Sequence, residues 1–280
     1  MKAAPLAGRR IGISISESPD MAILGLGFEH LQDAMSEIAR HLLACGASLA
    51  YGGDLREGGF TELLFEIVER YRSRNDEGRV LVDNYLAWPS HVLSTPIKLQ
   101  SLAEALKGMA DLVLLRPDGS RIDLSQRLSV AQPSNELAAE EWSAGLTAMR
   151  NVMASRIDAR VALGGRISGY RGAMPGIAEE ALIQVGKKSP LYILGGFGGC
   201  SLAIAKAMGL TERSASLKTP ASFPGLDQFE RLGTKDLHNG LSPSENRLLA
   251  KTVHIDEAVA LILRGLMKLK PKSRTRQKRT

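Results

Sequence analysis

The chain has 280 residues, of which 44% are apolar and 24% are charged, and this composition is typical of a globular protein. It is long enough to bury a sizeable core, and no apolar stretch approaches the roughly 20 residues that a membrane-spanning helix needs. The formal net charge of +6 arises from the segment 267–280, which has seven basic residues and no acidic ones, whereas the rest of the chain has 29 basic and 30 acidic residues. The main part of the chain therefore lacks the overall positive charge typical of a nucleic-acid-binding protein.

The ends of the chain and its two cysteines bear on its location and its organisation. We expect the segment 267–280 to be a disordered basic tail, and the alternative is that this tail contacts nucleic acid. The segment 1–9 lacks the apolar core of a signal peptide, and we expect it to be flexible. Cys45 and Cys200 do not have the spacing of a metal site or of a CxxC motif. We therefore expect one domain over residues 10–266, cytoplasmic, with reduced thiols, no metal, no cofactor and no membrane contact.

Apolar runs rich in β-branched residues recur along the chain at the intervals of alternating strands and helices. The predicted strands are 10–16, 47–53, 79–85, 110–116, 159–165 and 190–196, with a short edge strand at 252–255. The predicted helices are 28–46, 59–74, 101–109, 134–156 with Ser134 as its N-cap, 175–188 and 200–209. Two polar segments, 116–135 and 210–247, are predicted to be long loops or small excursions from this pattern. This alternation indicates an α/β protein with a Rossmann-like, doubly wound and mainly parallel sheet that has helices on both faces.

Three of the predicted strands end in a pair of glycines and lead into a predicted helix. The pairs are Gly52–Gly53, Gly164–Gly165 and Gly195–Gly196. Glycine lets the backbone approach a ligand closely, and the free N–H groups at a helix N-terminus favour an anion. Ligands of such sheets bind at the carboxyl ends of the strands, where all three pairs are predicted to lie. The sequence thus predicts one crevice for a nucleotide or a nucleotide-derived molecule.

The first glycine loop and the end of the first strand offer hydroxyl and carboxylate groups to such a ligand. Gly58, Gly59 and Thr61 open the predicted helix, where their N–H groups and the Thr61 hydroxyl would hold a phosphate or a ribose. Asp54 would accept a hydrogen bond from a ribose hydroxyl, and the alternative is a solvated loop residue. Ser14 and Ser16 are either phosphate contacts or ordinary residues at the end of a strand.

The other two glycine loops add charged and aromatic candidates. In the second loop, Arg166 and Arg171 are candidate partners of a phosphate or carboxylate, and Tyr170 is a candidate for stacking on a base. The third loop contributes Gly195, Gly196, Phe197, Gly198 and Gly199. Glu179 and Glu180 are predicted in the first turn of a helix, where the macrodipole stabilises them. The alternative is that one of them attacks a ribosyl carbon or acts as a general base.

Four segments together carry a resemblance to a known group of proteins. They are ISISESPD, LAYGGDLREGGFTELLFEIV, ALGGRISGYRGAMPGIAEEAL and PLYILGGFGGCSLAIAKAMG. They resemble the SLOG superfamily, which unites the cytokinin-activating LOG phosphoribohydrolases, the DNA-processing proteins of natural transformation and bacterial conflict-system sensors. The similarity is greatest to the TIR- and PNP-associating SLOG branch, and it covers nearly all of residues 10–265.

The resemblance implies a Rossmann-like fold that binds nucleotides or messengers derived from them, such as ADP-ribose-type products of TIR domains. LOG enzymes have a glutamate after the glycine turn in their PGGxGTxxE motif, whereas the segment LGGFGGCSLAIAK here has no acid. This difference favours a sensor in a prokaryotic defence or signalling system, with a separately encoded effector or messenger-producing enzyme as its partner. The alternative is a nucleoside 5′-monophosphate N-glycosidase that uses Glu179 or Glu180. The resemblance also implies a homo-oligomer.

Overall fold

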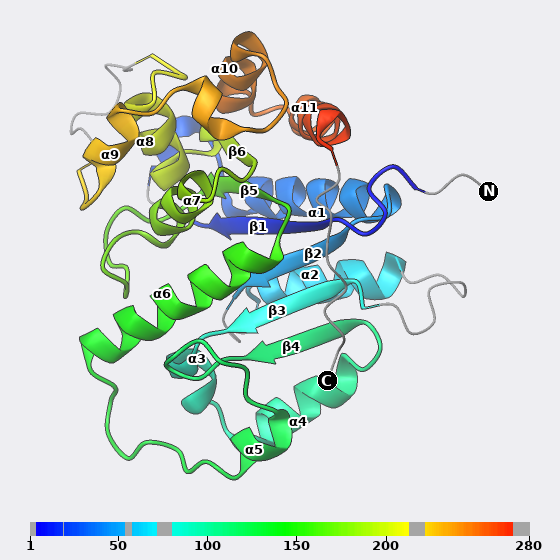
Figure 1. The fold of residues 1–280 in the computed structure, drawn as a ribbon, viewed down its shortest axis with the longest axis vertical. Helices are drawn as coiled ribbons and strands as arrows, with labels where there is room; N and C mark the ends of the chain where they lie inside the picture. The colour runs from blue at the N-terminus through cyan, green and yellow to red at the C-terminus, as the bar shows by residue number, and fades with distance from the viewer. Residues whose placement is uncertain (1–3, 19, 54–57, 72–79, 213–221, 271–280) are drawn as a thin grey trace.

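The computed structural model describes residues 4–18, 20–53, 58–71, 80–212 and 222–270. Their centre is a six-stranded sheet of order β4-β3-β2-β1-β5-β6, in which every pair of neighbouring strands is parallel (Figure 1). The strands are β1 (Arg10–Ser16), β2 (Ser48–Gly52), β3 (Val82–Leu86), β4 (Ala110–Leu114), β5 (Ala159–Gly164) and β6 (Leu191–Leu194). The predicted α/β, Rossmann-like fold is confirmed. The strand order reverses between β1 and β5, and ligands of such sheets bind at this switch point.

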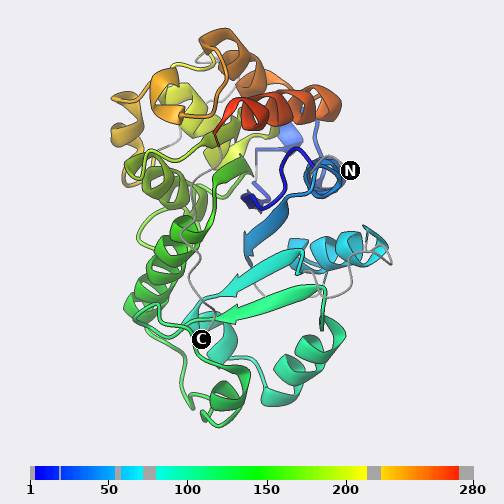
Figure 2. The ribbon, with the colours of Figure 1, turned by 45° about the vertical axis from the view of Figure 1, so that its right-hand side comes forward.

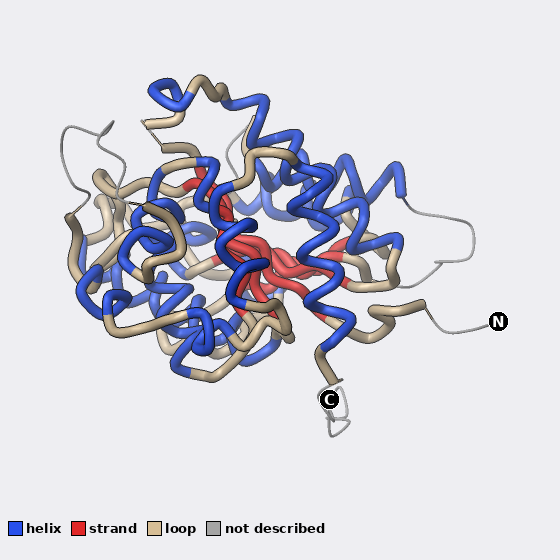
Figure 3. Tube along the Cα trace, turned by 90° about the horizontal axis from the view of Figure 1, so that it is seen from above, coloured by secondary structure: helices blue, strands red, loops and turns tan. Residues whose placement is uncertain are grey.

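Helices cover both faces of the sheet, as the views in Figures 1, 2 and 3 show. One layer contains α1 (Phe28–Ala44), α2 (Phe60–Tyr71) and α11 (Ile255–Lys268), and the other contains α6 (Ala139–Arg156), α7 (Gly176–Gly186) and α8 (Gly199–Ala207). The other described elements are η1 (Ala22–Leu24), α3 (Trp88–Val92), α4 (Pro96–Ala105), α5 (Leu124–Leu128), η3 (Gly195–Phe197), α9 (Leu226–Glu230), η4 (Thr234–Leu237) and α10 (Pro243–Lys251). None of the described helices has both the length and the apolar character of a membrane span.

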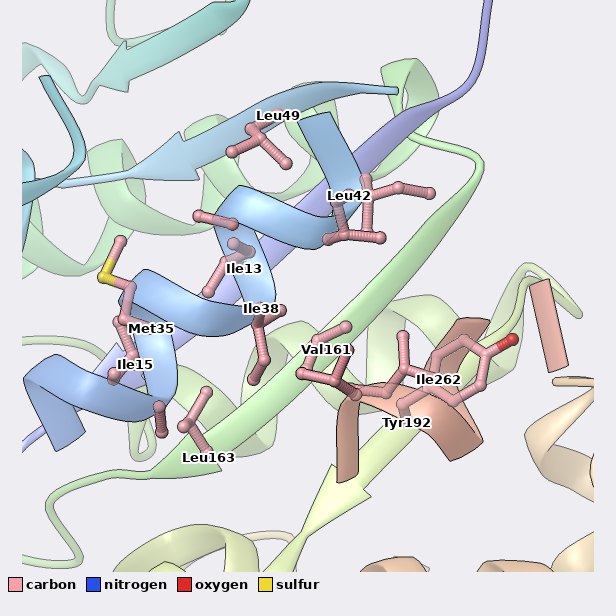
Figure 4. Packing of buried hydrophobic residues seen from close by; sticks show 14 of the residues in the cluster. Ile13, Ile15, Met35, Ile38, Leu42, Leu49, Val161, Leu163, Tyr192 and Ile262 are labelled. Carbon is pink, nitrogen blue, oxygen red and sulfur yellow. The ribbon is translucent and has the colours of Figure 1, made fainter. Parts of the chain in front are cut away.

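The largest core lies between α1 and the central strands, with α11 at its side (Figure 4). Met35, Ile38 and Leu42 form one apolar stripe on α1, as their helical spacing predicts. They pack over Ile13 of β1 and Val161 of β5, and both of these residues are buried. Within the segment 1–9, Leu6 is fully buried in this core, and its N–H donates to the carbonyl of Cys45.

Some predicted elements are wrong, in each case because a local capping group sets a different boundary. No strand forms at 252–255, since α10 ends at Lys251 and the Thr252 hydroxyl accepts a hydrogen bond from the His254 N–H just before α11. Ser134 is not the N-cap of α6. That helix begins at Ala139, where the Glu141 carboxylate accepts a hydrogen bond from the N–H of Ala138.

Other differences lie in segments that were predicted to be short or irregular. α4 begins at Pro96, five residues before the predicted start, because Thr95 caps it by accepting a hydrogen bond from the Lys98 N–H. The two segments predicted as loops contain α5 in one case, and α9, η4 and the start of α10 in the other. These elements are short, so they leave too little periodicity in the sequence for detection.

A buried arginine fixes α3, which forms one wall of the cavity described below. Arg127 of α5 is fully buried, and its Nη2 donates to the carbonyls of His91, Val92 and Ser94 at 2.7, 3.0 and 3.1 Å. Carbonyls at a helix C-terminus lack partners within the helix, so Arg127 caps α3. Its Nε also donates to His91 Nδ1 at 3.1 Å, and His91 Nε2 lies 2.9 Å from the carbonyl of Leu115. The His91 ring is therefore neutral, with its proton on Nε2.

The neutral state of His91 predicts that folding stability depends on pH. Burial lowers the pKa of His91 to about 4, whereas an unfolded histidine titrates near 6.5. The stability contributed by neutral His91 is therefore fully present above pH 6.5 and is lost as the pH falls from 6.5 towards 4, to a total of about 3 kcal/mol. Urea unfolding at pH 7.0, 6.0 and 5.0 measures this slope. The variant His91→Gln is expected to lose the histidine part of the slope, and equal slopes for the two proteins would contradict the assignment.

Candidate functional site

A cavity of about 560 Å³ opens at the carboxyl ends of β1 and β2, beside the switch point of the sheet. Its size lies within the range of roughly 300–1,000 Å³ that is usual for ligand sites. Its other walls come from α3, from α6, from the start of α7 and from the loop 166–171. Eight residues that the sequence predicts as site residues line it: Ser14, Ser16, Gly52, Gly53, Arg166, Tyr170, Arg171 and Glu180.

A buried charge cluster adjoins this cavity and is formed by Ser14, Arg150, Arg160, Glu179 and Glu180, of which Ser14, Arg150 and Glu180 also line the cavity. Arg160 Nη1 lies 2.7 Å from Glu180 Oε2 and 2.6 Å from Ser14 Oγ, and the Ser14 hydroxyl donates to Glu180. Arg150 Nη1 pairs with Glu179, and its Nε lies 3.9 Å from Glu180 Oε1. None of the five side chains belongs to an exposed residue, and Arg160 is fully buried. Two positive and two negative charges thus balance one another inside the protein.

Burying the four charges of the cluster costs free energy, and the ion pairs between its arginines and glutamates stabilise it. Burial lowers the pKa of Arg160, and the charge of Glu180 acts in the opposite direction. An isolated buried charge would be strongly destabilising, whereas two pairs with hydrogen bonds offset most of that cost. The cluster also connects elements that are distant in sequence, because it joins β1, β5, α6 and α7. It therefore fixes the start of α7 and the middle of α6 against the sheet, on either side of the cavity.

The two glutamates differ in what they offer to a ligand. Both oxygens of Glu179 are engaged, one by the Thr147 hydroxyl and the other by Arg150, and Glu179 does not line the cavity among the residues described. Glu180 does line it. Its Oε2 is held by Ser14 and Arg160, while its Oε1 accepts no hydrogen bond from a described residue. Glu180 is therefore the carboxylate that a bound ligand would meet.

The glycines of the second loop serve close packing. A Cβ on Gly164, which has a φ of +65°, would lie 2.4 Å from the carbonyl oxygen of Ser16. A Cβ on Gly165 would lie 2.7 Å from Ile177 Cδ1, and one on Gly176 would lie 2.7 Å from Arg150 Nη2. These glycines let the ends of β1 and β5, α7 and the Arg150 side chain come together. Gly164 and Gly165 shape the cavity from behind its lining.

The structure describes only part of the first glycine loop. Gly52 and Gly53 line the cavity, and a Cβ on Gly53 would lie 2.3 Å from Thr61 Oγ1. Thr61 is buried, and neither it nor Gly58 nor Gly59 belongs to the described lining. Asp54 lies outside the described residues. The hydroxyl of Thr61 therefore packs behind the glycine turn.

The third loop lies next to the second, but other groups of the same chain occupy its N–H group at Gly199 and the space around its glycines. The N–H of Gly199, at the start of α8, donates to both carboxylate oxygens of Asp20 at 2.9 Å. A Cβ on Gly196 would lie 2.3 Å from the carbonyl oxygen of Thr252, and Phe197 is buried in the main core. In the described part of the chain, residues 195–199 do not line the cavity. Gly195, Gly196, Gly198 and Gly199 thus surround groups of their own chain, and their contact with a ligand stays a prediction.

Sequence reasoning missed three residues of this region. They are Trp142, Arg150 and Arg160, all of which lie outside the glycine loops. The signal for Arg160 is its place in the apolar run ARVALGG, because a charge inside a buried strand requires a partner. Cys200, at the start of α8, is buried, and burial raises the pKa of its thiol to about 12, so this cysteine packs in the core as an unreactive thiol.

Comparison with known proteins places the chain in a family. Residues 5–224 match the model of the SLOG cluster2 family, whereas none of the curated proteins compared with the chain matches it. The match confirms the resemblance to the SLOG superfamily, and the narrower likeness to the TIR- and PNP-associating branch stays a prediction. Membership indicates a nucleotide-related function. With more than half of its length covered by the model, the chain belongs to the SLOG cluster2 family.

Proposed function

We propose that this protein is a sensor that binds a nucleotide-derived messenger of ADP-ribose type in the cavity at the switch point. The observation that carries the proposal is the combination of this cavity with exposed arginines at its rim and a charge-balanced cluster adjoining it. An anionic ligand would meet Arg166 and Arg171, both exposed, rather than the neutralised charges of the cluster.

The lining supports binding of each part of such a ligand. Arg166 would pair with a phosphate, and Ser16 would donate a hydrogen bond to it. Glu180 Oε1, which has no described hydrogen-bond donor, would accept a hydrogen bond from a ribose hydroxyl. Tyr170 lines the same cavity and would stack on a base. The recognition thus depends on side chains of β1, α7 and the loop between β5 and α7.

The ion pairing favours binding over hydrolysis. Glu179 has both oxygens engaged, and Glu180 is held by a serine and an arginine, so neither carboxylate is arranged as a free nucleophile. In a prokaryotic defence or signalling system, the partner of such a sensor would be a separately encoded effector or a messenger-producing enzyme. We further propose that it works as a homo-oligomer. Contact between the basic tail and nucleic acid is a separate proposal, and the tail residues 271–280 lie outside the described part of the chain.

One observation favours a second function, that of a nucleoside 5′-monophosphate N-glycosidase. The Oε1 atom of Glu180 belongs to a residue of the cavity lining and accepts no hydrogen bond from the described residues. It would take a proton from water as the water oxygen bonds to the ribosyl C1′ atom and the glycosidic bond breaks, and this proton would then pass, directly or through solvent, to the nitrogen of the departing base. Glu179 is too fully engaged for this role.

Binding and turnover measured on the same protein distinguish the two functions. We expect isothermal titration calorimetry to detect ADP-ribose binding to the wild-type chain, and chromatography of the same sample to show no free base or ribose. Glu180→Gln removes the acceptor charge and is expected to weaken binding about tenfold, since a hydrogen bond to a charged group contributes roughly 1.5–3 kcal/mol. Release of adenine from AMP by the wild type, abolished in Glu180→Gln, would establish the enzyme instead.

A further inference from the structure

A second cavity adjoins the first and is not used by the ligand contacts described so far. It has a volume of about 660 Å³ and lies between the start of α6 and the loop that precedes α7. It shares four lining residues with the first cavity, namely Leu93, Trp142, Tyr170 and Arg171. On its far side lie the carboxylates of Glu136 and Glu140, both exposed. The second cavity thus adds two carboxylates to the shared Arg171, whereas Arg166 lines the first cavity alone.

The shared wall is formed by a cation–π pair. The Arg171 guanidinium carbon lies 4.2 Å from the centre of the Trp142 ring, so the arginine covers one face of the indole. Arg171 makes no hydrogen bond or ion pair with a described residue. The loop residues 166–174 likewise make no backbone–backbone hydrogen bond among the described residues. The stack on Trp142 is therefore the main specific contact of the Arg171 side chain, and replacing it breaks no other described interaction.

We propose that the ligand spans both cavities and that its second base replaces Arg171 on the face of Trp142. This inference rests on the proposed function and names the class of ligand: a molecule with two nucleoside-like halves joined by phosphates, rather than a mononucleotide. The phosphates stay in the first cavity, where the displaced Arg171 joins Arg166 in pairing with them. Glu136 and Glu140 accept hydrogen bonds from amino or hydroxyl groups of the second half.

The exchange is favourable because Arg171 and Trp142 each gain a new partner in place of the other. A guanidinium released from a half-buried indole finds a phosphate, which is a stronger and bidentate partner. The indole exchanges one planar cation for a planar base, and stacking of a base on an aromatic side chain contributes about tenfold or more to affinity. A ligand with a single base, such as a mononucleotide or ADP-ribose, leaves the Arg171–Trp142 stack in place. Trp142 therefore selects for a ligand that has a second base.

Calorimetry with two probes, ADP-ribose and NAD⁺, tests this selection, because NAD⁺ is ADP-ribose with a second base, nicotinamide, on its second ribose. The wild-type chain is expected to bind NAD⁺ at least about tenfold more tightly than ADP-ribose. Trp142→Ala should weaken the binding of NAD⁺ about tenfold, to the level of ADP-ribose, while the affinity for ADP-ribose changes less than about twofold. Trp142→Phe keeps an aromatic face and should restore most of the affinity. A loss that is equal for both probes, or no loss for either, would contradict the inference and leave the proposed function intact. Failure of the wild type to bind either probe would contradict both.

Tryptophan fluorescence gives a second readout that does not depend on affinity. The chain has two tryptophans, and Trp88 packs edge-on against His91, with ring centres 5.4 Å apart. NAD⁺ is expected to quench the emission of Trp142, whereas ADP-ribose, which lacks the second base, leaves it unchanged. The quenching should disappear in Trp142→Phe, which retains binding. Equal quenching by both probes, or quenching that persists in Trp142→Phe, would show that the second base does not reach Trp142.

Discussion

Replacing Arg160 with methionine is expected to lower the free energy of unfolding by about 3–5 kcal/mol, the cost of leaving a buried charge without its partner. Arg160 is fully buried, and its Nη1 is the donor that holds both Glu180 and Ser14. Without it, Glu180 keeps the hydrogen bond from the Ser14 hydroxyl, but the positive charge paired with it is then the distant Nε of Arg150, at 3.9 Å. Urea unfolding followed by circular dichroism measures the change. This loss is a large fraction of the roughly 5–15 kcal/mol by which a typical domain is stable to unfolding.

Two further variants separate the loss of a charge from the loss of a side chain. Arg247→Met removes an exposed arginine of α10 and is expected to change stability by less than about 0.5 kcal/mol. The double variant Arg160→Met with Glu180→Leu removes a whole pair and is expected to recover most of the stability, because apolar groups often replace a buried ion pair without loss. If Arg160→Met were as mild as Arg247→Met, the buried charge cluster would not have the role assigned to it.

Substituting Gly164 with alanine is expected to destabilise the protein by more than about 2 kcal/mol and to weaken ADP-ribose binding. Left-handed backbone costs a residue with a Cβ roughly 1–2 kcal/mol, and the new Cβ would also lie 2.4 Å from the Ser16 carbonyl oxygen. That oxygen accepts a hydrogen bond from the Gly165 N–H at 2.7 Å, so the ends of β1 and β5 would have to separate. Ser16 would then move out of the cavity wall.

Gly169 offers a matched control with the same backbone conformation. Its φ is also +65°, but a Cβ built there meets nothing within 4 Å. Gly169→Ala therefore carries the conformational cost alone, about 1–2 kcal/mol. Thermal unfolding of the two variants side by side measures the contribution of the close approach at Gly164. Equal destabilisation would show that the approach of Gly164 to Ser16 contributes nothing beyond backbone preference.

The sequence predicts those parts of the fold whose signal is local. Most strands of the sheet lie in apolar runs, although β3 contains Asp83 and Asn84, and Gly52 and Gly164 mark where two strands end. Helix boundaries depend on single capping groups, such as Thr95 at α4, which compete with equally plausible neighbours. The strand order follows from the connections and not from any one segment, so only the general doubly wound architecture is predictable.

Contacts between distant segments decide what the glycine loops do, and no local pattern contains them. Asp20 is separated from Gly199 by 179 positions, yet its carboxylate occupies the N–H group that was predicted to bind a phosphate. The pairing of Glu180 with Arg160 spans 20 positions and joins a helix to a strand. It converts a glutamate that looks like an ordinary residue of a helix start into part of a buried cluster. The second loop and the end of β1 therefore form the candidate site, while the third loop is filled by its own chain.

Hydrogen exchange measured by mass spectrometry, with and without saturating ADP-ribose, tests this account most directly. Ligand in the cavity orders the loop 166–174 and the start of α7, whose N–H groups are expected to exchange more slowly, together with peptides from the first half of α6. Peptides that cover residues 195–201 are expected to be unchanged, since Asp20 already occupies the start of α8. Protection confined to residues 195–201, or no protection at any position, would contradict a nucleotide-binding site at the carboxyl ends of β1 and β2.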